Sequence, residues 1–172
     1  VMSLYQVLQA VREADIPYFI FSSSCSVYGA EAELPVRESS PLGRAESPYA
    51  YTKQIGERLC EDLAKAWPDW RCCLLRYFNP AGAHPSGLLG EIPQAGAYNV
   101  LPILMEAHLG LRPQFQVHGS DYETRDGTCI RDYIHVMDLA AAHTQALRFL
   151  MQAPQERPAL SLFNLGSGQG QT

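Results

Sequence analysis

The chain has 172 residues, of which 47% are hydrophobic and 18% charged, a composition that is ordinary for a globular protein and excludes intrinsic disorder. Its 13 lysines and arginines against 18 aspartates and glutamates give a formal net charge of −5, which argues against nucleic-acid binding because that needs a basic patch. The sequence has no run of about 18 apolar residues, so we predict no membrane-spanning segment.

Cysteine and histidine usage predicts a cytoplasmic protein without a metal. The 5 cysteines form no C-x-x-C pair, so neither a disulfide framework nor a zinc ribbon is expected, and a reducing compartment fits better. The first residues carry no basic region and no small-residue cleavage site, so we expect no secretion signal. The 5 histidines lack spacings such as H-E-x-x-H, and no metal site is predicted.

Hydrophobic periodicity predicts helices that alternate with short strands. Leu4, Leu8 and Val11 recur at helical spacing near the start of the chain, and Ser47 followed by Pro48 is typical of the beginning of a second helix. In chain order we expect a helix over 3–14, a strand over 18–24, a surface loop over 29–47, a helix over 49–66, a strand over 71–79, a helix over 99–109, strands over 114–118 and 131–134, a helix over 136–151 and a strand over 160–165. This alternation predicts an α/β fold with a parallel sheet.

The sequence contains no dinucleotide-binding fingerprint. That motif is a G-x-G-x-x-G turn between a strand and a helix, where the pyrophosphate lies on the helix N-terminus. The glycines at 166, 168 and 170 have a different spacing, and no helix is predicted after them. We interpret this stretch as a loop that follows a strand.

Three side chains form a candidate catalytic group. Tyr49 and Lys53 lie one helical turn apart and therefore share a face of the predicted helix. An ammonium close to a phenol favours the phenolate, which can act as a general base. Ser24 ends a predicted buried strand, at the carboxyl edge where open α/β sheets bind ligands. A Ser at a strand end can equally cap the backbone, and a Tyr and a Lys at this spacing can equally be solvated.

Four blocks of sequence resemble one known family. They are FIFSSSCSVYG at 19–29, SPYAYTK at 47–53, LRYFNPAGAHPSG at 75–87, and DYETRDGTCIRDYIHVMDL at 121–139. The first two are similar to the strand signature and active-site helix of the extended short-chain dehydrogenases/reductases. The last two narrow the resemblance to the UDP-glucose 4-epimerase branch of that family.

The resemblance implies a Rossmann-type fold and a role for each matching residue. Ser24, Tyr49 and Lys53 would be catalytic, with Tyr49 as the base, and would also contact NAD together with Phe78. The substrate contacts that it implies are Ser24, Tyr49, Asn79, Asn99, Arg131 and the uracil-facing stretch Gln116, Val117 and His118. The forked guanidinium of Arg131 suits a diphosphate, although a surface ion pair with a nearby aspartate is the alternative.

The resemblance also implies an organisation and a reaction. Residues 1–79 would form the second half of an NAD-binding domain, and residues 80–172 would combine nucleotide-sugar-binding segments with returning Rossmann elements. The glycine-rich cofactor half and the C-terminal end of the family would be absent. The expected reaction interconverts UDP-galactose and UDP-glucose through a 4-keto sugar, with tightly bound NAD, in a homodimer that pairs helices 3–14 and 49–66.

Other interpretations stay open. One is a related NAD-dependent nucleotide-sugar dehydratase or decarboxylase, although no acidic residue follows Ser24 as is usual there. Another is an inactive, truncated module that only folds, dimerises or binds a nucleotide sugar. The residues compared favour neither plain nor N-acetylated hexoses as substrates.

Overall fold

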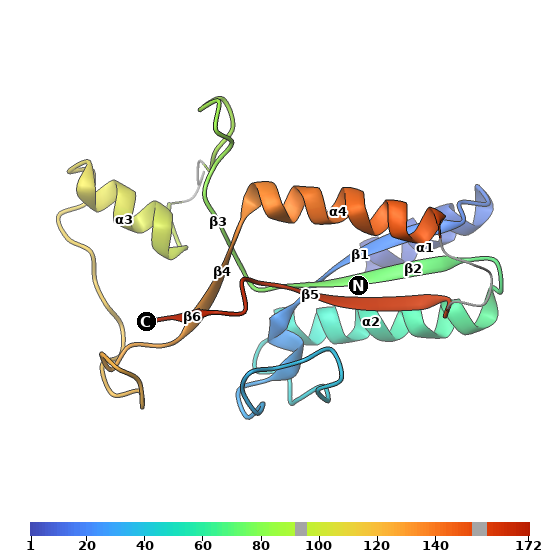
Figure 1. Ribbon diagram of the computed structural model, residues 1–172, viewed down its shortest axis with the longest axis horizontal. Helices are drawn as coiled ribbons and strands as arrows, with labels where there is room; N and C mark the ends of the chain where they lie inside the picture. The colour runs from blue at the N-terminus through green and yellow to red at the C-terminus, as the bar shows by residue number, and fades with distance from the viewer. Residues whose placement is uncertain (92–95, 153–157) are drawn as a thin grey trace. The chain divides into compact units, whose positions relative to one another are not determined.

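The computed structural model describes residues 1–91, 96–152 and 158–172 (Figure 1). Within them the chain divides into two compact units. The first unit comprises Val1–Phe78 and Ala140–Leu165, and the second comprises Asn79–Leu139 and Gly166–Thr172. The chain therefore leaves the first unit after Phe78 and returns to it along one helix.

A parallel sheet forms the centre of the first unit. Its strands are β1 (Tyr18–Ser24), β2 (Arg71–Tyr77) and β5 (Leu160–Leu165), in the order β1-β2-β5. The register sets Ser24 opposite Tyr77, and Tyr77 opposite Leu165, so the carboxyl ends of the strands are level. This is the edge at which parallel α/β sheets place their ligand sites.

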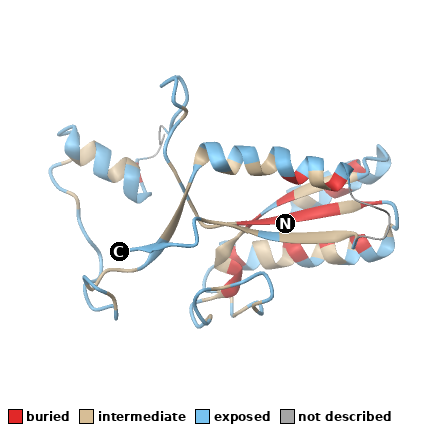
Figure 2. Cartoon of the chain, viewed as in Figure 1, coloured by how far each residue is buried: buried red, intermediate tan, exposed pale blue. Residues whose placement is uncertain are grey.

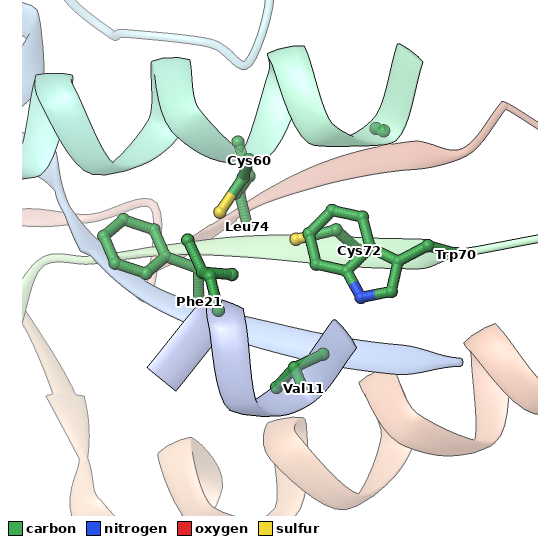
Figure 3. Close-up of a cluster of buried hydrophobic side chains, with 8 residues drawn as sticks. Val11, Phe21, Cys60, Trp70, Cys72 and Leu74 are labelled. Carbon is green, nitrogen blue, oxygen red and sulfur yellow. The ribbon is translucent and has the colours of Figure 1, made fainter. Parts of the chain in front are cut away.

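Helices cover both faces of this sheet because the central strand is apolar on both sides. On one face, α1 (Met2–Glu13) and α2 (Pro48–Ala66) pack on the strands around Cys72 and Leu74. Figure 3 shows this cluster, with Val11 from α1 and Cys60 from α2 facing the sheet. On the other face, α4 (Val136–Met151) packs through its C-terminal half against Cys73 and Leu75. The buried residues are concentrated in the strands of this sheet and on those sides of the helices that pack against it (Figure 2).

The second unit has little regular structure. Its strands are β3 (Asn79–Ala81), β4 (Arg131–His135) and β6 (Gly170–Gln171), with β4 parallel to β3 and antiparallel to β6. Its helix α3 (Val100–His108) has no buried residue among those described. A 3₁₀ helix, Cys25–Tyr28, follows β1 in the first unit.

The structure confirms the predicted α/β class and the order of its main helices and strands. The predicted strand over 114–118 is wrong: this segment has no strand pairing, and Gln116, Val117 and His118 are exposed. A short apolar run becomes a strand only where a partner strand accepts its hydrogen bonds. The predicted strand over 71–79 is also too long, because β2 ends at Tyr77 and a separate strand begins at Asn79.

Candidate active site

Ser24 lies at the carboxyl end of β1, where the chain enters the 3₁₀ helix. Its Oγ accepts hydrogen bonds from the backbone N–H of Ser26 at 3.2 Å and from the Ser26 hydroxyl at 3.0 Å. Ser24 is therefore the N-cap of this short helix. Its hydroxyl hydrogen is still available for donation, because both contacts use the oxygen as acceptor.

The start of α2 positions Tyr49 and Lys53. Ser47 caps the helix by accepting a hydrogen bond from the backbone N–H of Ala50 at 3.1 Å, and Pro48 occupies the first turn. One turn later, the Nζ of Lys53 lies 5.4 Å from the centroid of the Tyr49 ring. Tyr49 is 56% exposed, so its phenol is accessible to a ligand. Tyr49 and Lys53 thus lie on the same face of α2, as predicted.

Lys53 links this helix to the end of β1. Its Nζ donates a 2.7 Å hydrogen bond to the backbone oxygen of Ser22 and lies 5.5 Å from the centroid of the Phe21 ring. Partial burial lowers the pKa of Lys53 from its ordinary value. The hydrogen bond fixes the direction of the ammonium.

Tyr77 and His143 lie close to this group, and the sequence analysis did not identify them. The Tyr77 hydroxyl donates to Ser22 Oγ at 2.7 Å and lies 2.6 Å from Nε2 of His143 on α4. Burial raises the pKa of Tyr77, and the hydrogen bond with Ser22 offsets only part of that rise. The position of Tyr77 at the end of a predicted strand could have indicated a site residue. Its partner His143 could not be predicted, because it lies on α4, far away in the sequence. Phe78 follows directly, and its backbone N–H donates to the oxygen of Leu165 at 3.0 Å.

Apart from Ser24 and Tyr49, the predicted substrate residues lie in the second unit. Asn79 is in β3 opposite Tyr133, and Arg131 begins β4 as an exposed residue with its Nη1 donating to the backbone oxygen of Ile130 at 3.0 Å. Asn99 precedes α3, and its amide donates to Glu91 at 2.9 Å. Arg131 and Tyr133, which pairs with Asn79, thus lie on the same strand, β4. Residues 116–118 lie in an exposed loop.

A second group that the sequence analysis missed stabilises the strand of Arg131. The carboxylate of Asp132 accepts hydrogen bonds from the backbone N–H and hydroxyl of Ser167, both at 2.7 Å, and from the N–H of Gly168 at 2.9 Å. These bonds hold the loop after β5 against β4. Asp132 therefore does not pair with Arg131, and among the ion pairs of the described residues none involves Arg131.

The described residues contain no group of three or more His, Cys, Asp or Glu side chains that could hold a metal ion. In that same part of the chain, no helix has the length and apolar character that crossing a membrane would require.

A family model described as "NAD dependent epimerase/dehydratase family" matches residues 1–166. The chain belongs to this family. Among curated relatives, it is 44% identical over 164 residues to a UDP-glucose 4-epimerase of Yersinia pestis, which covers 95% of this chain and 47% of that protein. It is 46% identical over 164 residues to UDP-glucose 4-epimerase 1 of Oryza sativa subsp. japonica, which covers 95% of this chain and 46% of that protein.

Solved epimerase structures share the fold. The UDP-glucose-4-epimerase of Stenotrophomonas maltophila, solved with NAD and formylated UDP-arabinopyranose, has a TM-score of 0.89 at 45% identity over 96% of this chain and 48% of that chain. The enzyme of Bifidobacterium longum, solved with NAD⁺ and UDP, has a TM-score of 0.89 at 40% identity over 99% of this chain and 49% of that chain. This chain of the epimerase/dehydratase family spans about half the length of the relatives that it matches.

Proposed function

We propose that the protein is a UDP-glucose 4-epimerase, which interconverts UDP-galactose and UDP-glucose with tightly bound NAD. The observation that carries the proposal is the Lys53 ammonium, held by the Ser22 oxygen beside the accessible ring of Tyr49. The relatives named UDP-glucose 4-epimerase at 44–46% identity support the choice of substrate.

The residues around β1 and α2 fit a nicotinamide cofactor chemically. The Tyr49 and Ser24 hydroxyls and the Lys53 ammonium belong to the end of β1 and the start of α2, where a ribose could accept their hydrogen bonds. Lys53 is the proposed ribose contact, and Ser24, Tyr49 and Phe78 are the other proposed cofactor contacts. When bound, NAD would accept a hydride from the sugar C4 and later return it.

In the proposed mechanism, Tyr49 removes the proton from the sugar 4-hydroxyl and later gives it back. Lys53 favours the phenolate form of Tyr49 during this transfer, and Ser24 donates a hydrogen bond to the sugar oxygen. The sugar passes through a 4-keto form and turns over, so that the configuration at C4 inverts. All three residues act on protons or charge at the same sugar oxygen.

The second unit is proposed to hold the UDP part of the substrate. The exposed guanidinium of Arg131 is free to bind a diphosphate with two parallel hydrogen bonds, and Asn79 and Asn99 would supply amide groups. The exposed loop Gln116, Val117 and His118 is the proposed uracil contact. A firm hold on the UDP part would let the keto sugar rotate without leaving the enzyme.

In the proposed domain organisation, one part of the chain binds the cofactor and the other binds the nucleotide sugar. Residues 1–79 would belong to the NAD-binding domain, and residues 80–172 would hold nucleotide-sugar-binding segments together with returning Rossmann elements. The first compact unit includes Ala140–Leu165, which contains most of α4 and all of β5, and this supports the proposal that Rossmann elements return after residue 80. We further propose a cytoplasmic homodimer that pairs α1 and α2, because both helices carry exposed apolar side chains.

A nucleotide-sugar dehydratase is the second candidate. An NAD-dependent NDP-hexosamine 5,6-dehydratase shares the fold, with a TM-score of 0.73 at 27% identity over 98% of this chain and 47% of that chain. The epimerases in the comparison are more similar, at 40–45% identity for two solved with NAD. Loss of water from the substrate would identify the dehydratase reaction.

The test is conversion of UDP-galactose to UDP-glucose by the full-length protein with NAD. We expect Tyr49→Phe to lower kcat by about 10²-fold or more, the scale of a general base. Tyr51→Phe is the matched control, because Tyr51 is an exposed tyrosine on the same helix and should leave kcat unchanged. Near-normal turnover by Tyr49→Phe would contradict the assignment of the base, and a product lighter by one water would favour the dehydratase.

A further inference from the structure

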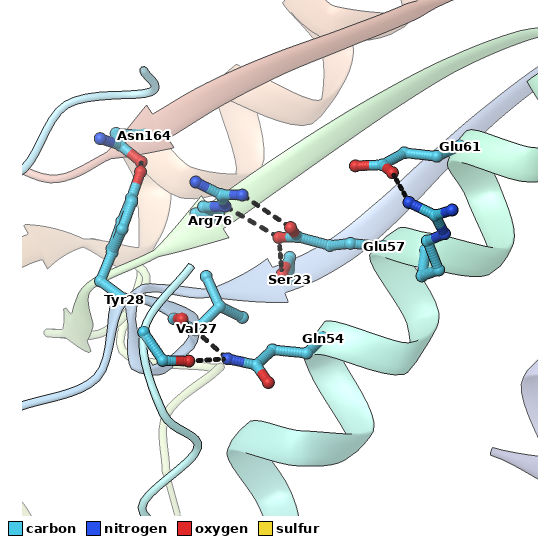
Figure 4. A network of polar contacts seen from close by, with 10 residues as sticks. Ser23, Val27, Tyr28, Gln54, Glu57, Glu61, Arg76 and Asn164 are labelled. Atoms are coloured by element: carbon cyan, nitrogen blue, oxygen red, sulfur yellow. Dashed lines mark hydrogen bonds and ion pairs between the residues drawn. The ribbon is translucent and has the colours of Figure 1, made fainter. Parts of the chain in front are cut away.

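One turn beyond Lys53, α2 carries a glutamate that is fully buried. Glu57 is 0% exposed, although a buried carboxylate is costly unless it is paired. Its partners are Ser23 of β1, which is 1% exposed, and Arg76 of β2, which is 5% exposed (Figure 4). The three side chains connect the helix to β1 and β2, two of the three strands of the sheet.

The contacts of Glu57 are short and use both carboxylate oxygens. Oε1 accepts a hydrogen bond from the Ser23 hydroxyl at 2.5 Å and one from Arg76 Nε at 2.8 Å. Oε2 accepts a bond from Arg76 Nη2 at 2.7 Å. The Arg76–Glu57 pair is therefore bidentate, an arrangement that fixes orientation as well as distance.

Arg76 extends the contacts to two further elements. Its guanidinium carbon lies 4.6 Å from the centroid of the Tyr28 ring in the 3₁₀ helix, and the Tyr28 hydroxyl donates to Asn164 Oδ1 of β5 at 2.6 Å. Burial alone would lower the pKa of Arg76, but its interactions with Glu57 and Tyr28 together outweigh burial and raise it. Arg76 thus stays charged while it ties the loop after β1 to the sheet.

Two successive turns of α2 bind two successive residues of β1. Lys53 donates to the backbone oxygen of Ser22, and Glu57 accepts from the hydroxyl of Ser23. A slide of the helix along the strand would have to break both contacts together. Since Lys53 alone is a flexible, half-exposed side chain, the rigid pair at Glu57 is the stronger of the two contacts.

We propose that Glu57 and Arg76 are positioning residues, which fix α2 against the carboxyl end of β1 and so hold the Lys53 ammonium on the Ser22 oxygen, where it lies next to Tyr49. A buried ion pair is often no more stabilising than apolar residues of similar volume, so stability alone does not account for it. The inference that this pair fixes the position of Lys53 rests on structure alone. Its consequence for catalysis rests on the proposed epimerase function.

The experiment compares two variants of the full-length protein with a matched control. Glu57→Gln removes the charge but keeps the shape and an oxygen acceptor for Arg76, although it leaves the buried Arg76 charge unpaired. The double variant Glu57→Met with Arg76→Met replaces the whole pair by apolar groups, which often preserves stability. Glu61→Gln is the control, because Glu61 pairs with Arg58 on the solvent side of the same helix (Figure 4).

Three quantities are measured, and the first two concern catalysis by the folded fraction. We expect kcat of both Glu57 variants to fall by about 10- to 100-fold with KM for UDP-galactose unchanged, the scale of a misplaced catalytic group. We also expect the acidic limb of the pH–rate profile to move to higher pH, because a displaced ammonium favours the Tyr49 phenolate less.

The third quantity is the pH dependence of Lys53 labelling by an amine reagent, read by mass spectrometry. Partial burial lowers the pKa of Lys53, so a loosened helix should return it toward its ordinary value and shift labelling to higher pH. Folded Glu57 variants with wild-type kcat, acidic limb and labelling would overturn the proposal. If the wild-type protein does not epimerise UDP-galactose, the proposed function fails, and the Lys53 labelling alone still decides the positioning role.

Discussion

At the scale of single residues, the chemistry depends on how a few polar groups are held in a mostly apolar unit. Lys53 is directed by one backbone oxygen, and Tyr77 by Ser22 and His143 on the other face of the sheet. Ser22 therefore serves both groups, Lys53 through its backbone oxygen and Tyr77 through its side chain. This density of polar contacts at strand ends is typical of a ligand-binding edge.

Buried thiols next to these groups predict a loss of stability at alkaline pH. Burial raises the pKa of Cys73 to about 11, and a hydrogen bond with Cys60 together with burial raises the pKa of Cys72. Unfolded thiols lose their protons from about pH 8.5. The stability from the neutral thiols is therefore complete below that pH and is lost as pH rises toward about 11. Each group contributes a slope of about 1.4 kcal/mol per pH unit in this window.

Urea unfolding between pH 7.5 and 10.5 measures this slope. Cys73→Ala should make the fall in the free energy of unfolding less steep, whatever its effect on stability at pH 7.5. Cys129→Ala removes a half-buried thiol of the second unit and is the control. An identical slope in the wild type and in Cys73→Ala would show that Cys73 does not titrate as its burial implies.

At the scale of elements, the close approach of α2 to β1 and α1 decides the geometry of the site. Gly56 lies between Lys53 and Glu57 in the helix, and a Cβ there would lie 2.9 Å from Cε1 of the buried Phe21 ring and 3.1 Å from Cδ2 of Leu4. Only glycine therefore lets the helix pack so closely. The same approach brings Lys53 within reach of the backbone of β1.

Gly56→Ala should therefore destabilise the protein, although alanine is the better helix former. The gain in helix propensity is about 1 kcal/mol, and the cost of forcing the packed ring and helix apart is about 1–3 kcal/mol. Thermal unfolding should show a lower Tm for Gly56→Ala. Gly90→Ala is the control, since a Cβ at that position meets only Ala83 at 3.8 Å. A Tm at or above the wild-type value would mean that α2 has room to move.

At the scale of the whole molecule, the chain divides into two units that differ in how much regular structure and apolar core they contain. The first has the parallel sheet and the buried clusters, and the second has short strands and a helix without buried residues among those described. Within the second unit, the Asp132 carboxylate accepts hydrogen bonds from the backbone N–H groups of Ser167 and Gly168 and so binds their loop to β4. Side-chain hydrogen bonds here replace part of the missing apolar core.

The proposed dimer makes a prediction at this scale. Tyr5 and Val7 of α1 are each 49% exposed, whereas Leu8 and Val11 of the same helix are buried against the sheet. A charge among the exposed side chains should oppose burial in a dimer. Tyr5→Glu with Val7→Glu should halve the mass of the full-length protein measured by light scattering.

Leu111→Glu is the control for the dimer, because Leu111 is an exposed leucine of the second unit. It should leave the mass unchanged. A wild-type protein that is monomeric at micromolar concentration, or a double variant that remains a dimer, would contradict the assignment of α1 to the interface.

The sequence alone was enough to predict the α-helices and strands of the first unit, though not its 3₁₀ helix, and the local part of the candidate site. Helical spacing and the Ser47–Pro48 cap determine α2, and α2 alone places Tyr49 and Lys53 on one face. These are short-range relations, which repeat along one element and can be read from neighbouring residues.

Only the tertiary structure decided the partners that come from distant parts of the chain. The pairing of Glu57 with Arg76, of Tyr77 with His143, and of Asp132 with Ser167 joins residues on different elements. The predicted strand at 114–118 failed for the same reason, since pairing depends on whether another strand lies beside it. Local pattern determines an element, whereas hydrogen-bond partners and burial are properties of how the elements pack.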